Sequence, residues 1–206
     1  MAKVSVQPEE FTFVNYDAKR IIALAEEMAA HAGLGDDVAI TIEIDEKSPF
    51  GYTTSAVDGP TVTIFAESAA FEDAKNLREL SEEGSRQVLG RLLYRVGDRM
   101  DPAFGDPPPD KGLSFEQSSA WNAYAMGRLE RAGYFAHKER RRYAFRIRHG
   151  FTDVADQVFD RLWASETLTW ADIEAACAQT AAVRPERETK GPKSKAKAKA
   201  KAKAGK

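Results

Sequence analysis

Apolar side chains recur at spacings of three and four along residues 17–32, a pattern that predicts a helix. Asp17 is expected to cap its start and Gly33 to end it. A second helical pattern runs over about residues 77–100, with an expected interruption at Gly84. Its apolar side chains gather on one side of the helical wheel, and two arginines and an aspartate share an edge of the polar side.

Alternating apolar and polar positions predict strands between these two helices. Residues 38–45 and 61–68 each alternate with a period of two, which is typical of a strand with one buried face. The turn-rich segment between them is expected to hold a short strand near Tyr52. A small sheet is therefore predicted in the first half of the chain.

The second half is predicted to be helical apart from one hairpin. A capping box at Ser114 opens a helix that ends at Gly133. Residues 134–148 alternate apolar and basic side chains near their end, which predicts a hairpin. Two more helices are expected after Thr152 and Thr169, because each threonine is a good N-cap.

These elements predict an α+β fold in a single domain over residues 1–183. The sheet and its helices occupy about residues 17–133, and the hairpin and later helices occupy residues 134–183. Residues 184–206 contain mainly Lys, Ala, Gly and Pro. Such a segment cannot bury apolar surface, so we expect it to be a disordered tail.

Composition narrows the possible classes of function. The chain has 206 residues, of which 43% are hydrophobic, enough for a buried core. Its apolar runs are too short to cross a membrane, and its start lacks the apolar region of a signal peptide. One cysteine and three histidines make a disulfide framework, a Cys-only zinc site or a His-rich metal site unexpected. We therefore expect a cytoplasmic protein.

The net charge of −2 hides a strong asymmetry between the body and the tail. The last 17 residues hold eight lysines and no acid, so the rest of the chain carries 22 basic against 32 acidic side chains. This asymmetry predicts that the tail binds a polyanion such as nucleic acid, with a possible association with the nucleoid. The lysines concerned are Lys190, Lys193, Lys195, Lys197, Lys199, Lys201, Lys203 and Lys206.

The lysine–alanine run over residues 193–206 resembles the tails of linker histones and of some actinobacterial nucleoid proteins. That resemblance implies binding to nucleic acid without sequence preference, because the run has no side chain suited to reading bases. The alternative is a tail that aids solubility and has no partner.

The second helix contains Arg91-Leu92-Leu93-Tyr94-Arg95, followed by Asp98 and Arg99. This segment resembles the active helix of small zincin-like metallopeptidases, with the H-E-x-x-H motif degenerate and the H-x-x-D-R continuation retained at its end. The resemblance covers about residues 17–133. It implies a mixed sheet packed on helices, with strand 61–66 lining the substrate cleft.

The replaced residues predict a protein without catalysis, metal or other cofactor. Zinc on such a helix needs two imidazole lone pairs and a glutamate that activates water. Arg91 and Arg95 have no lone pair to offer, and Leu92 removes the general base. Asp98 is then expected to pair with Arg95. The alternative is an ordinary amphipathic helix with a solvated, salt-bridging polar face.

A second basic segment covers residues 138–148, with six bases and one acid. As a strand of the predicted hairpin, it would bury Tyr143, Phe145 and Ile147 and present basic side chains on the other face. That face could lie along phosphates and would hold Arg142, Arg146 and Arg148. The alternative is an exposed strand whose arginines cover the acidic body.

Three functions follow from these patterns. The first is a non-catalytic, zincin-like protein that binds nucleic acid or another polyanion through its tail. The second is a metal-dependent hydrolase with atypical ligands, for which the candidates are Asp98, Asp101, Glu82, Glu83 and Glu130. The third is an interaction module in which the sheet edge at residues 61–66 binds a peptide or protein by strand addition.

Overall fold

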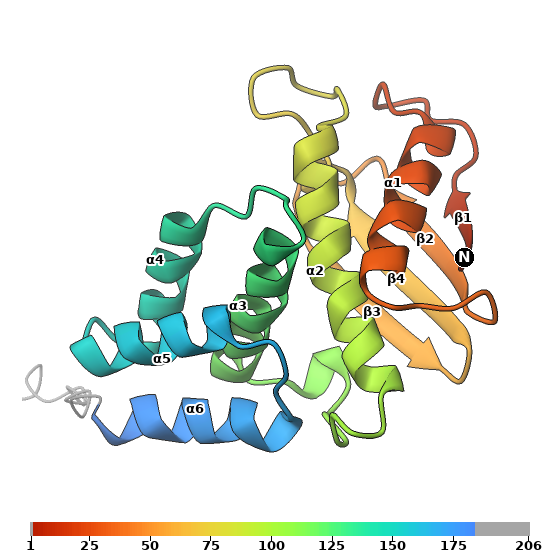
Figure 1. The fold of residues 1–206 in the computed structure, drawn as a ribbon. Coiled ribbons are helices and arrows are strands. Elements are labelled where there is room, and N and C mark those ends of the chain that lie inside the picture. Colours follow the sequence, from red (N-terminus) through yellow and green to blue (C-terminus); the bar gives the residue numbers. More distant parts are fainter. Residues whose placement is uncertain (1, 184–206) are drawn as a thin grey trace, which may run out of the picture.

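The structure is a computed structural model, and it describes residues 2–183. Figure 1 shows a sheet on one side and a group of helices on the other. The strands are β1 (Lys3–Gln7), β2 (Ala39–Asp45), β3 (Thr53–Asp58) and β4 (Thr61–Glu67). The helices are α1 (Ala18–His31), α2 (Glu82–Met100), α3 (Phe115–Arg131), α4 (Lys138–His149), α5 (Asp153–Ala164) and α6 (Trp170–Ala182), with short 3₁₀ turns η1 (Ser68–Ala70) and η2 (Asp110–Gly112).

The four strands form one mixed sheet in the order β1-β2-β4-β3. β1, β2 and β4 are parallel, whereas β3 pairs antiparallel with β4. The predicted α+β class with a mixed sheet is therefore confirmed. The helix capped by Asp17 is also confirmed, since the Asp17 side chain accepts the Lys19 N–H.

The prediction that residues 61–66 form an exposed strand edge is wrong. β4 lies inside the sheet, because β2 pairs with one of its sides and β3 with the other. The tight turn at Gly59, whose φ is +55°, folds β3 back beside β4 and makes β3 an edge strand, with β1 at the other edge.

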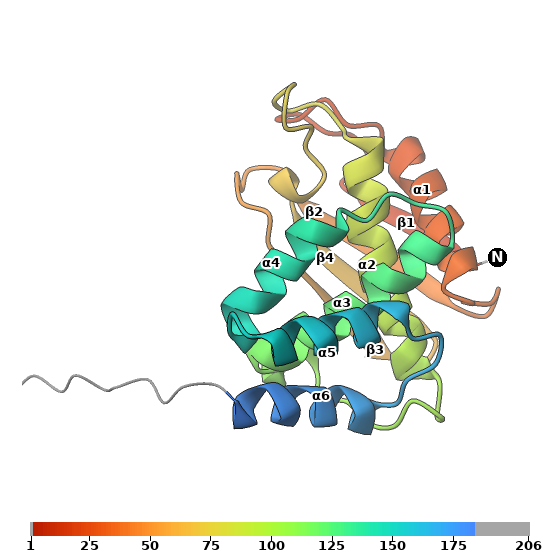
Figure 2. The same cartoon turned by 60° about the vertical axis from the view of Figure 1, so that its left-hand side comes forward.

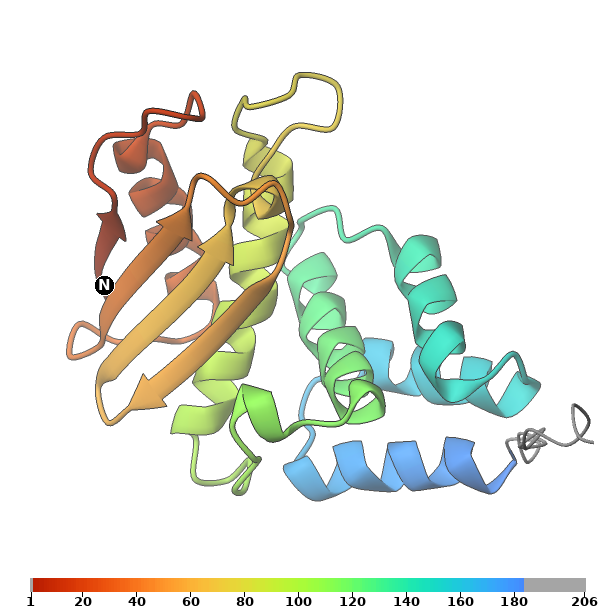
Figure 3. The same ribbon diagram turned by 180° about the vertical axis from the view of Figure 1, so that it is seen from behind.

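Helices α1 and α2 cover one face of the sheet (Figures 1 and 3). Ile42, Ile64 and Leu92 are fully buried in the core that they enclose. Figure 3 shows the opposite face of the sheet without a helix across it. Alternate residues of β4, such as Thr63 and Phe65, belong to this second face and are half-buried.

Helix α2 begins later than its apolar pattern predicts. The Ser81 hydroxyl accepts the Gly84 N–H at 3.1 Å, so the helix starts at Glu82. Gly84 lies in the first turn and does not interrupt the helix, contrary to the prediction. Glu82 and Glu83 at this end favour the start of the helix through its dipole.

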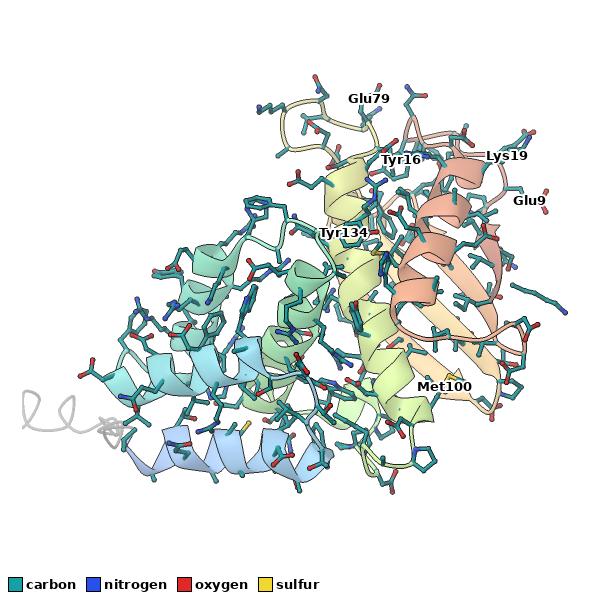
Figure 4. The ribbon with its side chains drawn as sticks, viewed as in Figure 1. Glu9, Tyr16, Lys19, Glu79, Met100 and Tyr134 are labelled. Carbon is teal, nitrogen blue, oxygen red and sulfur yellow. The ribbon has the colours of Figure 1, made fainter. Side chains whose placement is uncertain are left out.

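The remaining helices form a second group around α3, which contacts α2, α4, α5 and α6. Figure 2 shows α4, α5 and α6 on the side of α3 away from the sheet. α3 and α5 approach very closely at Gly127, where an added Cβ would lie 2.8 Å from the carbonyl carbon of Trp163. Tyr134, labelled in Figure 4, follows α3 and donates its hydroxyl to Glu27 of α1 at 2.7 Å.

The predicted hairpin at residues 134–148 is wrong, because residues 138–149 form helix α4. Phe145 is buried, but Tyr143 and Ile147 are 58% and 49% exposed. The apolar alternation therefore does not mark a buried strand face. Lys, Glu, Arg and Ala make up most of this segment and favour helices, which outweighs the short run of alternation.

None of the helices among residues 2–183 combines the length and apolar character needed to cross a membrane. The predicted tail at residues 184–206 lies outside the described residues, as do the eight lysines assigned to it.

Candidate functional site

Three arginines of α2 line the side of the helix next to the sheet edge. Arg91, Arg95 and Arg99 follow each other at four-residue intervals, which places them along one side of the helix. The Arg91 guanidinium donates to the Thr53 hydroxyl at the start of β3, with 2.7 Å between Nη2 and Oγ1. Arg91 and Arg95 stand at the positions of the two histidines in an H-E-x-x-H motif. Both lie on the side of α2 that faces neighbouring elements of the fold.

Asp110 of η2 connects this row of arginines to strand β3. Its Oδ1 atom accepts from Arg95 Nη2 at 2.5 Å and from Arg99 Nη2 at 2.7 Å. Its Oδ2 atom accepts the backbone N–H of Ser55 at 2.9 Å and also lies near the Ser55 and Thr54 hydroxyls, at 3.2 and 3.3 Å. One carboxylate therefore pairs with two cations and also accepts the Ser55 N–H, which points away from β4 at the edge of the sheet.

Burial alone would raise the pKa of Asp110. Arg95, the Ser55 N–H and Arg99 outweigh that effect and lower the pKa below its ordinary value. Asp110 is therefore ionised at neutral pH and supplies a full negative charge beside Arg95 and Arg99.

An aromatic side chain of α3 supports the same arginines. The guanidinium carbons of Arg95 and Arg99 lie 4.6 and 4.5 Å from the centre of a Trp121 ring. Arg95 also donates from Nη1 to Asn122 Oδ1 at 3.1 Å, and its side chain is only 3% exposed. Cation–π contacts hold these two guanidinium groups in fixed positions.

Burial, together with the like charges of Arg95 and Arg141, lowers the pKa of Arg91 to about 9. Burial also lowers the pKa of Arg95 to about 10, although Asp110 acts in the opposite direction. Burial lowers the pKa of Arg141 as well. Guanidinium stays protonated at neutral pH, so these directions mean that the protein holds the positive charge of these buried arginines at a cost in free energy.

The predicted pair between Asp98 and Arg95 is wrong. Asp98 forms a bidentate ion pair with Arg128 of α3, at 2.8 and 2.6 Å, and accepts the Trp121 indole N–H at 2.6 Å. α2 is enclosed by α1, α3 and the sheet, and Asp98 meets its partners on α3 rather than on its own helix. Leu92, at the position of the expected general base, is fully buried in the apolar core.

The other carboxylates considered as metal ligands are dispersed. Glu82 pairs with Arg20, Glu130 accepts the Trp163 indole N–H, and Asp101 accepts the N–H of Ala103. Glu83 lies 3.6 Å from His137. Over residues 2–183, no group of three or more His, Cys, Asp or Glu side chains is arranged to hold a metal ion.

The basic residues of the predicted hairpin lie on α4, and two of them pair with carboxylates of α5. Arg142 makes a bidentate pair with Asp160 at 2.8 and 2.7 Å, and Arg146 makes one with Asp156 at 2.6 Å for both contacts. Arg148 lies over the Phe115 ring at 4.5 Å. Arg142 and Arg146 therefore join α4 to α5.

Several residues around Arg91 and Arg95 are not assigned to a site by the sequence analysis. Arg99 extends the Arg91–Arg95 spacing by one further turn, and that spacing is the one signal that could have identified it. Arg141 reaches α2 from α4 and donates to Gln87 Oε1 at 3.4 Å. The residues contributed by other elements, which no local pattern marks, are Thr53, Ser55, Asp110, Trp121 and Asn122. No family model, no curated protein and no solved structure matches this chain.

Proposed function

We propose that this protein is a non-catalytic binder of nucleic acid or another polyanion, and that its lysine-rich tail makes the contact. The observation that carries the proposal is the run of eight lysines without an acid at positions 190–206. Phosphates neutralised by lysines release their counterions, which favours binding to any sequence. A cytoplasmic, nucleoid-associated location follows from binding to DNA.

The proposal that the body is non-catalytic rests on the arginines of α2. Arg91 and Arg95 place fixed positive charge where an H-E-x-x-H helix needs neutral imidazoles, and a dication is repelled by such charge. Asp98 engages both of its oxygens with Arg128 and Trp121. A metal-dependent hydrolase using Asp98 would first have to break that ion pair.

A zincin-like scaffold is part of the same proposal. It is supported by the antiparallel edge strand β3 of a mixed sheet, which contacts the arginine-bearing helix α2. The hydrogen bond from Arg91 to Thr53 links these two elements, and in this proposal β3 takes the cleft-lining position that the resemblance assigns to residues 61–66.

The test compares the full chain with a tail-neutral chain, in which the eight lysines of residues 190–206 are replaced by glutamine. We expect the full chain to bind duplex DNA with a log–log salt slope of up to about −7, since each contact contributes about −0.9. The tail-neutral chain should lose most of this affinity at low salt. Both chains are measured by fluorescence anisotropy across a series of salt concentrations.

The matched control replaces the same eight lysines by arginine, which keeps the charge and changes the side chains. We expect it to bind DNA as the full chain does. Equal DNA affinity of the full and tail-neutral chains would contradict a role for the tail.

A second candidate function is peptide binding by strand addition at β3, one of the two edge strands of the sheet. A groove of about 580 Å³ runs along β3 and is bounded by the loop that carries Asp110. We expect Val57→Pro to abolish partner binding to the tail-neutral chain, because it removes an outward N–H of the edge strand. Affinity purification with the tail-neutral chain, with and without Val57→Pro, measures this loss of binding. If the full chain binds partners and the tail-neutral chain binds none, binding at β3 is contradicted.

A further inference from the structure

The cluster of arginines beside α2 contains more positive charge than its own residues neutralise. Four guanidinium groups gather there, from Arg91, Arg95, Arg99 and Arg141, and Asp110 is the carboxylate that pairs with two of them. Within residues 2–183, Arg91 and Arg141 have no carboxylate at ion-pair distance. Their hydrogen-bond partners are the neutral Thr53 hydroxyl and the neutral Gln87 amide.

Buried donors in the same cluster lack partners. The Nε atoms of Arg95 and Arg141 and the Nη1 atom of Arg99 are buried without a hydrogen-bond acceptor. A buried donor without an acceptor costs free energy, and a buried charge without a counter-charge costs more. An added anion with several oxygens would reduce both costs.

Two grooves are each lined by one arginine of the cluster. The groove along β3 is lined by Arg99, Asp110 and Lys111. A second groove of about 240 Å³ lies between α3 and α4 and is lined by Arg141 and Asn122, with the serines Ser118 and Ser119 beside them. Arg95 contacts a residue of each groove, Asp110 in the first and Asn122 in the second.

We propose that this cluster of Arg91, Arg95, Arg99 and Arg141 binds a phosphate group that enters from one of the two grooves. A phosphate has a larger charge and more acceptor oxygens than a carboxylate, so it better matches a surplus of three positive charges. Planar guanidinium groups bind such oxyanions in a bidentate manner. This site is separate from the tail, and the two proposals can fail independently.

The test uses inorganic pyrophosphate as the probe and the tail-neutral full chain as the parent, so that tail lysines do not contribute. We expect Arg91→Gln and Arg141→Gln each to weaken pyrophosphate binding by roughly 10-fold or more, because each removes a charged donor from the arginine cluster. Titration calorimetry at fixed ionic strength measures the affinity, and circular dichroism checks that each variant folds.

The matched control is Arg161→Gln, which removes the same charge from an exposed position on α5, where Arg161 donates to Gln179. It should leave the affinity for pyrophosphate unchanged. Equal affinities of the parent and Arg91→Gln, or an equal loss in Arg161→Gln, would overturn the proposal.

A third variant changes the affinity in the opposite direction. Asp110→Asn removes the competing negative charge, and we expect it to bind pyrophosphate more tightly, by roughly threefold or more. A damaged fold does not produce tighter binding. The Asp110→Asn measurement therefore still tests the proposal if an arginine variant unfolds. Weaker binding by Asp110→Asn would contradict the proposal.

A short oligothymidylate distinguishes two sources of the phosphate group. A parallel loss of oligothymidylate and pyrophosphate binding in Arg91→Gln identifies the backbone of a nucleic acid. A loss of pyrophosphate binding alone identifies a free phosphate or a small phosphorylated molecule, and either result supports the site.

Discussion

Gly127→Ala is expected to lower the free energy of unfolding by about 3 kcal/mol. The added Cβ would lie 2.8 Å from the carbonyl carbon and 2.9 Å from the Cα atom of Trp163, both in the backbone of α5. Backbone cannot rotate away as a flexible side chain can. α3 and α5 would therefore have to move apart along a contact between two helices.

That movement would also disturb two polar contacts of Trp163. Its indole N–H donates to Glu130 at 2.6 Å, and its carbonyl accepts from Arg131. The loss of free energy therefore includes both packing and hydrogen bonds. Urea denaturation followed by circular dichroism measures it as a lower midpoint with an unchanged slope.

Gly51→Ala is the matched control for this substitution. The nearest atoms to its added Cβ are 3.8 Å away, which is an ordinary contact. Its free energy of unfolding should change by no more than about 0.5 kcal/mol. A midpoint for Gly127→Ala close to that of the control would show that α3 and α5 can adjust around the extra methyl group.

Asp98→Ala is expected to destabilise the protein by about 3 kcal/mol, because it leaves a largely buried cation without its partner. The Arg128 side chain is 18% exposed and lies between the rings of Tyr94 and Tyr124, at 4.7 and 4.1 Å. The substitution also leaves the Trp121 indole N–H without its acceptor.

A double-mutant cycle with Arg128→Met separates the ion pair from the cavity. We expect the double variant to be more stable than the sum of the single losses predicts, by about 1 kcal/mol or more. Asp36→Ala, an exposed aspartate before β2, serves as the control and should have almost no effect. Similar losses for Asp98→Ala and Asp36→Ala would refute the structural role of this pair.

The sequence predicts local elements well where one face of an element is buried. The alternation of residues 38–45 and 61–68 predicts β2 and β4, and the apolar spacing of residues 17–32 with the Asp17 cap predicts α1. The same reasoning failed for α4, because Arg142 and Arg146 alternate with apolar residues and yet pair with α5. A short alternating run fits a helix as well when few of its side chains are buried.

The site was only partly predictable from the sequence. The arginine spacing on α2 identifies Arg91 and Arg95 as a pair, but their partners come from other elements. Arg128 is 30 residues from Asp98 in the chain, so no rule for neighbouring turns could assign that ion pair. The zincin-like resemblance and the role of the tail stay predictions.

Asp110 directly follows the three consecutive prolines Pro107, Pro108 and Pro109. Proline rings restrict φ, so this stretch has few conformations to lose when the chain folds. The entropic cost of holding the Asp110 carboxylate against Arg95 and Arg99 is correspondingly small. Asp110 is therefore a counterion that folding holds in place beside these arginines, and any incoming anion must compete with it.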